Sequence, residues 1–263
     1  MLVIGEKINS TRKDIKEAIA QKDENYLRDI AVKQAQAGAD YLDLNTGAFP
    51  TEEIELMKWL VEVVQQAVDT PLAIDSSNPA VLEAGLELNK NGTPFINSIT
   101  LEQPKFSTVL PLIKKYDAKI LALAIGPEGI AKTTDGRFDH AKQLIEALCS
   151  QGIAPEKIYL DPLIQPVSVQ NDFGLIALEV IQKVKEQFPD VNTICGLSNI
   201  SFGLPDRKHL NKCFLVMAMA MGLDSTIVDP LDNELMGGIT AAQALLGKDR
   251  FCKNYIKKFR SNS

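Results

Sequence analysis

The chain has 263 residues, of which 45% are hydrophobic, and it carries a formal net charge of −6 with a sequence pI of about 5.1. An acidic balance argues against a nucleic-acid binder, which normally presents a basic face. No stretch approaches the roughly 18 apolar residues of a membrane span, and the apolar start lacks the basic region of a signal peptide.

The cysteines are Cys149, Cys195, Cys213 and Cys252, and no two of them form a CxxC pair. In a chain of this length we expect them to be reduced and mostly buried. We therefore expect a cytoplasmic protein that has no membrane or nucleic-acid partner.

Apolar runs alternate with amphipathic segments along the chain. The first run, residues 2–8, ends at Asn9 and predicts a buried strand, and residues 25–39 have the apolar spacing of a helix. Further on, Asn78-Pro79 is typical of a helix start, with asparagine as the N-cap and proline in the first turn. The other predicted strands cover residues 41–47, 71–76, 95–98, 119–126, 158–162, 193–199 and 225–229. The other predicted helices cover residues 54–68, 80–90, 105–116, 137–151, 173–188, 208–221, 233–246 and 251–260.

Eight strands that alternate with helices predict a (β/α)₈ TIM barrel, for which about 250 residues is a usual size. The strand runs are apolar throughout, as strands covered on both faces require. The rival architecture, an open doubly wound sheet, needs a glycine-rich turn after the first strand, and Gly5 does not supply one. No linker or low-complexity stretch divides the chain, so we expect residues 1–263 to form a single domain.

Polar residues end almost every predicted strand, where a barrel carries its functional groups. Any one of them alone is best explained as the first residue of a loop. The run of them is harder to explain in this way, and it predicts a shared pocket. The strand-end residues are Asn9, Asp43, Asn45, Asp75, Ser76, Asn97, Ser98, Gly126, Asp161, Ser198, Asn199 and Asp229.

This predicted ring has many acceptors and almost no fixed positive charge, so a phosphate or a carboxylate is a poor central ligand. Carboxylates accept hydrogen bonds, whereas amides both donate and accept them. A flat, neutral heterocycle with several N–H donors fits such a ring, and a 2-amino-4-oxo-pyrimidine edge is one example. Charge-assisted hydrogen bonds of this kind contribute about 1.5–3 kcal/mol each.

Two other chemistries are disfavoured. Three carboxylates could hold a divalent cation, but such barrels usually add a base at a strand end, and the only candidate near one is Lys7. The two histidines, His140 and His209, fall in helix-like segments, so we expect no metal site. Cys195 lies within an apolar run, which favours a buried structural thiol over a nucleophile.

Motifs on separate strands resemble those of the pterin-binding methyltransferases. This family includes the methyltetrahydrofolate–corrinoid/iron–sulfur protein methyltransferases, similar corrinoid-dependent enzymes and the folate domain of cobalamin-dependent methionine synthase. The resemblance covers nearly the whole chain in order. The motifs are Gly5-Glu6-Lys7-Ile8-Asn9, Leu42-Asp43-Leu44-Asn45, Ile74-Asp75-Ser76, Ile96-Asn97-Ser98, Leu160-Asp161-Pro162 and Gly196-Leu197-Ser198-Asn199.

The resemblance implies a dihydropteroate synthase-like TIM barrel, usually a homodimer, that moves the N5-methyl group between methyltetrahydrofolate and the cobalt of a corrinoid (cobalamin) on a partner protein. It implies that Asn199 faces N5 and that Asp43 belongs to the hydrogen-bond network around N5. The direction of transfer and the corrinoid protein stay open. The implied ligand contacts are Asp75, Asn97 and Asp161 on the pterin ring, Gly196 and Ser198 beside it, and Arg207 near the benzoate–glutamate tail.

Alternatives remain at this point. Phe202 stands where corrinoid/iron–sulfur protein methyltransferases carry a polar residue, and this is more like methionine synthase. Dihydropteroate synthases share the fold, but they carry Asp-Pro-Gly where this chain has Asp161-Pro162-Leu163. A folate-binding barrel without catalysis is a third alternative. The methionine- and alanine-rich segment at 214–221 and the small-residue segment at 237–244 could form a dimer face or pack against the barrel.

Overall fold

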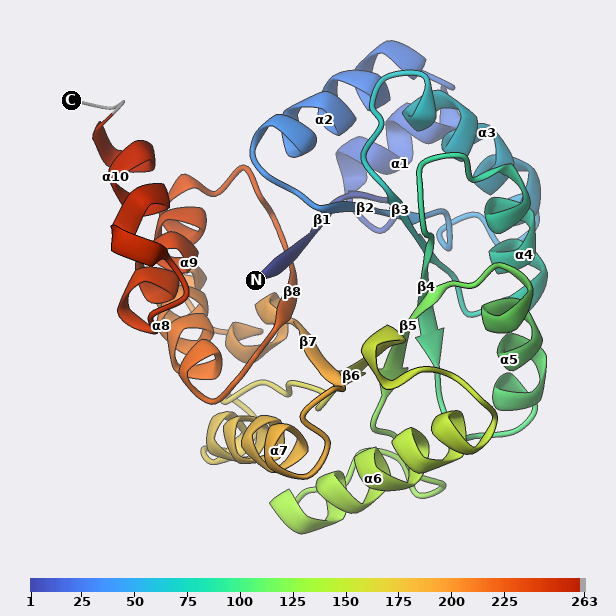
Figure 1. Cartoon of the computed structure of the whole chain (residues 1–263). Helices are drawn as coiled ribbons and strands as arrows, with labels where there is room; N and C mark the ends of the chain where they lie inside the picture. The colour runs from blue at the N-terminus through green and yellow to red at the C-terminus, as the bar shows by residue number, and fades with distance from the viewer. Residues whose placement is uncertain (261–263) are drawn as a thin grey trace.

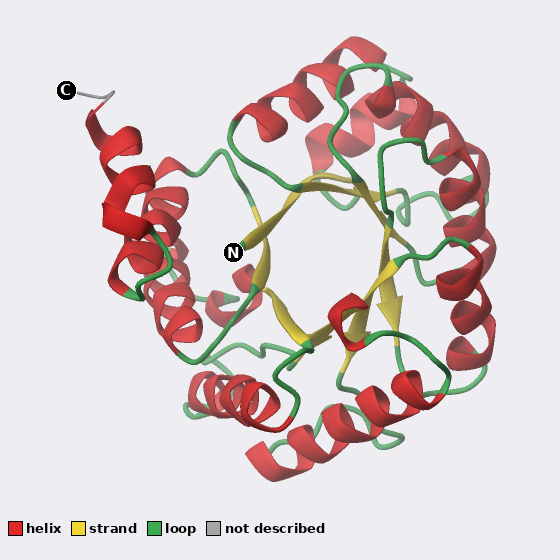
Figure 2. Ribbon diagram, viewed as in Figure 1, coloured by secondary structure: helices red, strands yellow, loops and turns green. Residues whose placement is uncertain are grey.

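The apolar runs of the sequence pair as parallel strands and close into a barrel (Figures 1 and 2). The structure is a computed structural model that describes residues 1–260, and within them eight strands follow one another in chain order around the ring. The last strand pairs with the first, with Leu2 beside Ser225. The predicted (β/α)₈ barrel is thereby confirmed. The strands are β1 (Leu2–Asn9), β2 (Tyr41–Asn45), β3 (Leu72–Asp75), β4 (Phe95–Ile99), β5 (Lys119–Leu123), β6 (Ile158–Asp161), β7 (Asn192–Gly196) and β8 (Ser225–Val228).

Helices form the outer layer of the molecule (Figure 2). Asn78 caps its helix as predicted, because its side chain accepts a hydrogen bond from the N–H of Ala80. Apart from α1 (Lys13–Ala20), the helices are α2 (Glu24–Gln36), α3 (Glu53–Gln65), α4 (Pro79–Leu88), α5 (Lys105–Lys115), α6 (Thr134–Ser150), α7 (Phe173–Gln187), α8 (Arg207–Ala220), α9 (Asn233–Leu245) and α10 (Lys253–Arg260), with short 3-10 turns η1 (Pro155–Lys157), η2 (Leu197–Ser201) and η3 (Arg250–Cys252).

One helix, α1 (Lys13–Ala20), was not predicted from the sequence. Its N-cap residue is Arg12, which makes no side-chain capping bond, so the usual start signal is missing. The helix instead depends on packing, because Ile15, Ala18 and Ile19 lie on one face and are buried.

Two predicted strand ends are shorter than expected. The strand predicted at 193–199 ends at Gly196, and Ser198 and Asn199 lie in η2. The strand predicted at 119–126 ends at Leu123, and Gly126 lies in the following loop. A polar residue or a glycine just after an apolar run therefore does not predict the last residue of the strand.

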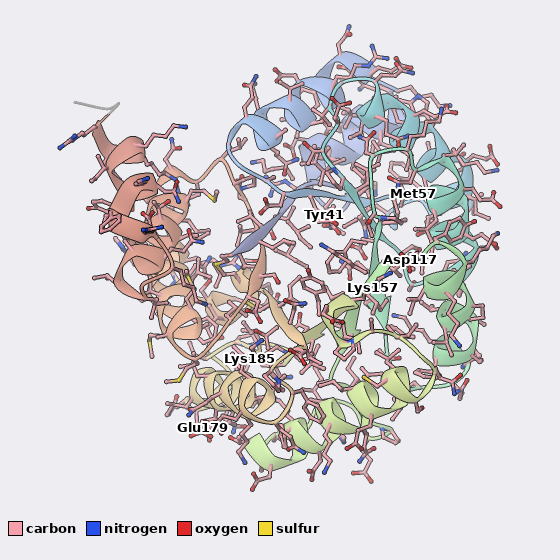
Figure 3. The ribbon with its side chains drawn as sticks, in the orientation of Figure 1. Tyr41, Met57, Asp117, Lys157, Glu179 and Lys185 are labelled. Carbon is pink, nitrogen blue, oxygen red and sulfur yellow. The ribbon has the colours of Figure 1, made fainter. Side chains whose placement is uncertain are left out.

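Alternation along the strands divides the core into an inner and an outer part. Outward residues such as Leu42, Ile74 and Ile96 are fully buried under the helices. The inner part has an aromatic centre, in which Phe95 packs against Tyr41 and Tyr159 with ring centroids 5.5 and 4.8 Å away. Figure 3 shows Tyr41 and the other side chains that fill the ring of strands. The barrel is thus closed by an apolar floor. No helix within residues 1–260 is long and apolar enough to cross a membrane.

Candidate functional site

The polar layer of the barrel follows from this floor by simple counting. In a strand, residues two apart point to the same side, so the residue two positions after each floor residue also points inward. Counting two from Tyr41, Ala73, Phe95, Tyr159 and Ile194 gives Asp43, Asp75, Asn97, Asp161 and Gly196. Glu6 on β1 lies at a shift in the strand register between Gly5 and Ile8, and its electrostatic interactions with Asp43 and Asp229 place it in the same layer. These residues lie toward the carboxyl ends of their strands, so the barrel mouth is lined mainly by carboxyl and amide groups.

Two carboxyls in this layer are paired with amides. The Nδ2 of Asn97 donates to the Oδ1 of Asp43 over 3.3 Å, and the Nδ2 of Asn45 donates to the Oδ2 of Asp75 over 2.9 Å. Burial raises the pKa of Asp43 well above its usual value, repulsion from Asp75 raises it further, and the bond from Asn97 opposes this rise. Burial also raises the pKa of Asp75. Asp43 and Asp75 therefore resist carrying two negative charges at once.

Asp161 is held from the loop that follows β6. Its Oδ1 accepts a hydrogen bond from the N–H of Leu163 over 2.7 Å, and it is only 7% exposed. Burial raises the pKa of Asp161 to about 6, against the opposing effects of the N–H groups of Leu163 and Gly196 and the charge of Arg137. The group is therefore a carboxylate at neutral pH, and its burial in the charged form destabilises the folded protein.

Arg137 holds that loop in place. Its side chain, 0% exposed, donates to the carbonyl oxygen of Leu163 over 2.8 Å and to the Oε1 of Gln165 over 2.9 Å. Leu163 adopts the left-handed region, with a φ of 61°, a conformation that costs a non-glycine residue about 1 kcal/mol or more. The contact from Arg137 stabilises this conformation, and the conformation directs the N–H of Leu163 at Asp161. The sequence placed Arg137 at the start of a helix and gave no sign of this role.

The other predicted residues come from η2 and the start of α8. Asn199 is exposed, and its Nδ2 lies 3.4 Å from the point where a side chain at position 196 would begin, so Gly196 leaves room for it. The Nη2 of Arg207 donates to the carbonyl oxygen of Ser198 over 2.5 Å, and its Nε donates to Ser201. Arg207 is thus tied to the same turn that carries Ser198 and Asn199.

Positive charge is closer to the mouth than the sequence indicated. The Nζ of Lys105, the first residue of α5, lies 3.2 Å from the Oγ of Ser98 and attracts Asp75 electrostatically. Lys7 points to Asp229, with its Nζ 3.0 Å from the Oδ2. The expectation of a ring with almost no fixed positive charge was therefore wrong. A lysine that opens a helix gives no sign in the sequence that it turns back toward a strand end.

The arrangement can bind a flat ring over an apolar floor and can exchange protons with it. Within residues 1–260, no group of three or more His, Cys, Asp or Glu side chains is placed to hold a metal ion. Carboxyls with raised pKa values, amides that donate or accept, and one lysine near Asp75 match a ligand with several N–H donors and a carbonyl.

Comparison with known proteins identifies the family of this chain. Residues 5–229 match the family model of the pterin binding enzymes. The chain is 39% identical over 262 residues to the methylcorrinoid:tetrahydrofolate methyltransferase of Eubacterium limosum, covering 99% of this chain and 96% of that protein. It is 34% identical to the methionine synthase of Mycobacterium tuberculosis over 87% of this chain, and it spans 20% of that longer protein.

Solved structures of dihydropteroate synthases share the fold. The Yersinia pestis enzyme aligns with a TM-score of 0.67 at 19% identity and 94% coverage of both chains. The Xanthomonas albilineans enzyme in complex with 7,8-dihydropteroate aligns with a TM-score of 0.68 at 20% identity, covering 93% of this chain and 92% of that one. Identities this low show a shared fold and nothing more. The family match covers most of the chain and the identity to a full-length relative is high, so the chain belongs to the pterin-binding enzyme family.

Proposed function

We propose that this protein is a methyltransferase that moves the N5-methyl group between methyltetrahydrofolate and the cobalt of a corrinoid carried by a partner protein. The observation that carries the proposal is the 39% identity to a methylcorrinoid:tetrahydrofolate methyltransferase along almost the full length of both chains. The polar layer at the barrel mouth supports it, because that layer suits the amine edge of a pterin.

In this proposal Asp75, Asn97 and Asp161 bind the pterin ring. A carboxylate at Asp161 accepts two N–H groups of the 2-amino-pyrimidine edge, and Asn97 can donate or accept beside it. Gly196 and Ser198 shape the slot on the η2 side. Arg207 is placed to attract the carboxylates of the benzoate–glutamate tail, since its charge is opposite to theirs.

The chemistry requires a proton at N5. When the methyl leaves, the electron pair of Co(I) forms the new cobalt–carbon bond, the electrons of the carbon–N5 bond stay on N5, and N5 gains a proton. In the other direction N5–H loses its proton and accepts the methyl from methyl-Co(III), which returns to Co(I). We assign Asn199 to N5, where its amide can donate or accept, and Asp43 to the surrounding hydrogen-bond network. The protein binds, orients and polarises.

A dihydropteroate synthase activity is less well supported. The loop after Asp161 has Pro162 and Leu163 where those enzymes carry Pro-Gly, and the solved dihydropteroate synthases are only 19–20% identical to this chain. A barrel that binds folate without catalysis would not need Asn199 at N5.

The direct test is to mix the protein with methyltetrahydrofolate and cob(I)alamin and follow the Co(I) absorbance. The proposal predicts loss of the Co(I) band at a rate proportional to the protein concentration. An unchanged band, with folate binding intact by calorimetry, would instead support the binding-only alternative. A condensation of a pterin diphosphate with aminobenzoate would support the synthase.

Two features support a partner and a second copy. Phe202, next to η2, is 64% exposed, as an apolar contact for a docking corrinoid protein would be.

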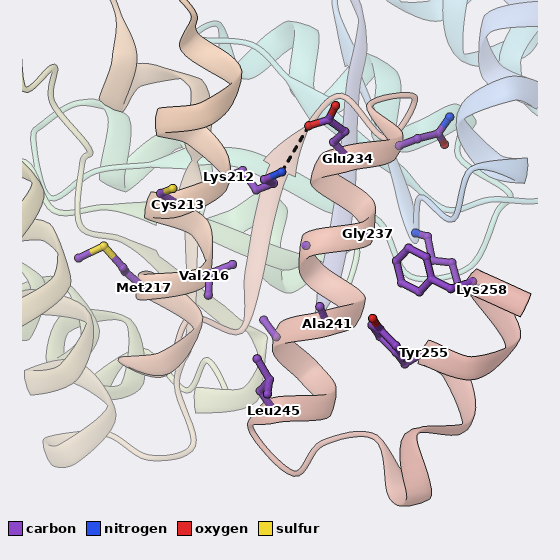
Figure 4. Close-up of a pocket in the computed structure, with 14 residues that line it drawn as sticks. Lys212, Cys213, Val216, Met217, Glu234, Gly237, Ala241, Leu245, Tyr255 and Lys258 are labelled. Carbon is purple, nitrogen blue, oxygen red and sulfur yellow. Dashed lines mark hydrogen bonds and ion pairs between the residues drawn. The ribbon is translucent and has the colours of Figure 1, made fainter. Parts of the chain in front are cut away.

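Helices α8, α9 and α10 enclose a groove of about 1000 Å³ on the outside of the barrel, with Lys212 and Glu234 paired at one end (Figure 4). We propose that this face forms a homodimer, because Met217 and Leu245 on it are 50% and 84% exposed.

We also propose that the protein acts in the cytoplasm. Within residues 1–260 all four cysteines are free, which fits a reducing compartment. The expectation that most of them are buried was wrong, because only Cys195 is buried.

A further inference from the structure

Glu6, on β1, carries a carboxyl group that has no role in the reaction described above. We propose that Glu6 is the group that gives N5 its proton when the methyl leaves and takes that proton back when the methyl arrives. This inference rests on the proposed function and adds a catalytic residue to it. The amide of Asn199 can orient N5, but it cannot store a proton at neutral pH.

An irregularity in the pairing of β1 leaves the side chain of Glu6 facing into the barrel. Ile4 belongs to the barrel floor, whereas a side chain at Gly5 would collide with Gln34 of the outer helix α2. The pairing of β1 with β2 shifts between Gly5 and Ile8, and both of these residues face the outer helices. The extra residue therefore leaves Glu6 and Lys7 on the inner side of the strand. Glu6 is only partly buried, so water from the mouth can reach it.

The charged neighbours of Glu6 locate it on the side of the mouth that carries the N5 residues. Its carboxyl interacts electrostatically with Asp229 beyond β8, with Asp43 on β2, and with Arg12, Lys7 and Arg207. Arg207 is hydrogen-bonded to Ser198, which immediately precedes Asn199. Glu6 therefore lies on the β1–β8 side of the mouth, close enough to interact with Asp43 and with Arg207, which holds the turn that carries Asn199.

The surroundings of Glu6 also suit proton exchange near neutral pH. Burial and repulsion from Asp229 raise the pKa of Glu6 to about 7, against the opposing effects of Arg12, Lys7 and Arg207. A group that is half protonated at the working pH can serve as an acid in one direction and a base in the other. The other inward carboxyls have fixed partners, because Asp43 accepts from Asn97, Asp75 from Asn45 and Asp161 from Leu163.

The proton balance is simple. In transfer to Co(I), the proton of the Glu6 carboxylic acid passes to N5 as the carbon–N5 bond breaks, and Glu6 is left as a carboxylate that solvent reprotonates. In transfer from methyl-Co(III), the Glu6 carboxylate takes the proton of N5–H as the methyl arrives, and it releases the proton to solvent. No other donor or acceptor is consumed.

The test is the pH profile of single-turnover methyl transfer from methyltetrahydrofolate to cob(I)alamin, between pH 5.5 and 8.5. For the wild type we expect a rate that falls about tenfold per pH unit above about 7, because the acid form of Glu6 is needed. Glu6→Gln should lower the rate at pH 6.5 by about 10²-fold or more and abolish this fall. Its Kd for tetrahydrofolate should stay within about threefold of the wild-type value, since Glu6 is not assigned to ring binding.

Two further variants sharpen the result. Asp229→Asn removes the carboxylate that raises the pKa of Glu6, so the fall should begin at a lower pH while the rate at pH 5.5 is preserved. Glu62→Gln, an exposed position on α3, is the matched control and should behave as the wild type.

A Glu6→Gln protein with the wild-type rate and an unchanged fall would overturn the inference. So would a parallel loss of tetrahydrofolate binding, which would make Glu6 a ligand contact. If the wild type itself transferred no methyl group at any pH, the proposed function would fail and this inference with it.

Discussion

Replacing Asp161 by asparagine should give a protein that is more stable than the wild type at neutral pH and binds folate more weakly. The pKa of Asp161 is about 6 in the folded protein, compared with about 3.9 for an unfolded aspartate. The folded state therefore binds more protons than the unfolded state between pH 4 and 6, and stability falls as the pH rises through this window. The difference in pKa corresponds to about 3 kcal/mol of cost above pH 6.

The asparagine variant does not carry this cost. Its carbonyl oxygen can keep the hydrogen bond from Leu163, but its NH2 group, unlike the second carboxylate oxygen, cannot accept from a backbone N–H such as that of Gly196. This lost bond costs about 1–2 kcal/mol. At pH 7.5 the free energy of unfolding of the variant should therefore exceed that of the wild type by about 1–2 kcal/mol. This difference should decrease by about 2 kcal/mol when the pH is lowered to 4.5. The other buried carboxyls are present in both proteins, so the difference isolates Asp161.

The assay is urea unfolding of both proteins at pH 4.5, 6 and 7.5, followed by the fluorescence of the single tryptophan, Trp59. Calorimetry at pH 7.5 should show a Kd for tetrahydrofolate raised by about 10- to 100-fold, because a charge-assisted bond worth about 1.5–3 kcal/mol is lost. A stability difference that does not change with pH would refute the reasoning, because it would mean that Asp161 ionises normally. Unchanged folate binding would refute its assignment to the ring.

Three further predictions concern rate, stability and assembly. Asn199→Ala should lower the methyl-transfer rate by about 10²-fold, the scale of one lost transition-state hydrogen bond, and a near-wild-type rate in a stopped-flow assay would reject the role of Asn199 at N5. Arg137→Met should lower the free energy of unfolding by about 3 kcal/mol or more, because buried carbonyl oxygens such as that of Leu163 lose their donor, and unchanged urea unfolding would contradict this. Met217→Asp should convert a dimer to a monomer in light scattering at micromolar concentration, since a charge would enter an apolar interface, and a dimer that persists would place the interface elsewhere.

Much of the fold and of the inward polar layer could be predicted from the sequence. The barrel follows from the alternation of apolar runs with amphipathic segments, and a polar end on an apolar strand already points to the mouth. Asp43, Asp75, Asn97 and Asp161 were singled out by that rule, and each lies two positions beyond a floor residue of its strand. This works because a strand has a fixed period of two and a barrel has only an inside and an outside.

The rest could not be predicted, because it depends on contacts between residues far apart in sequence. Glu6 lies within an apolar run rather than at its end, and its raised pKa comes from burial and from Asp229 across the β1–β8 pairing. Lys105 opens a helix and turns back to Ser98. Arg137 reaches a loop 26 residues away to hold Leu163. Local periodicity carries no information on such pairings.

Pterin binding at the barrel mouth can be measured by calorimetric titration of the protein with tetrahydrofolate, repeated with Asp75→Ala and Asn97→Ala. We expect one site per chain for the wild type and a Kd raised by about tenfold or more in each variant, because each removes a hydrogen-bonding group from the barrel mouth. A flat trace for the wild type, or binding that neither variant weakens, would contradict the claim that this layer binds a pterin.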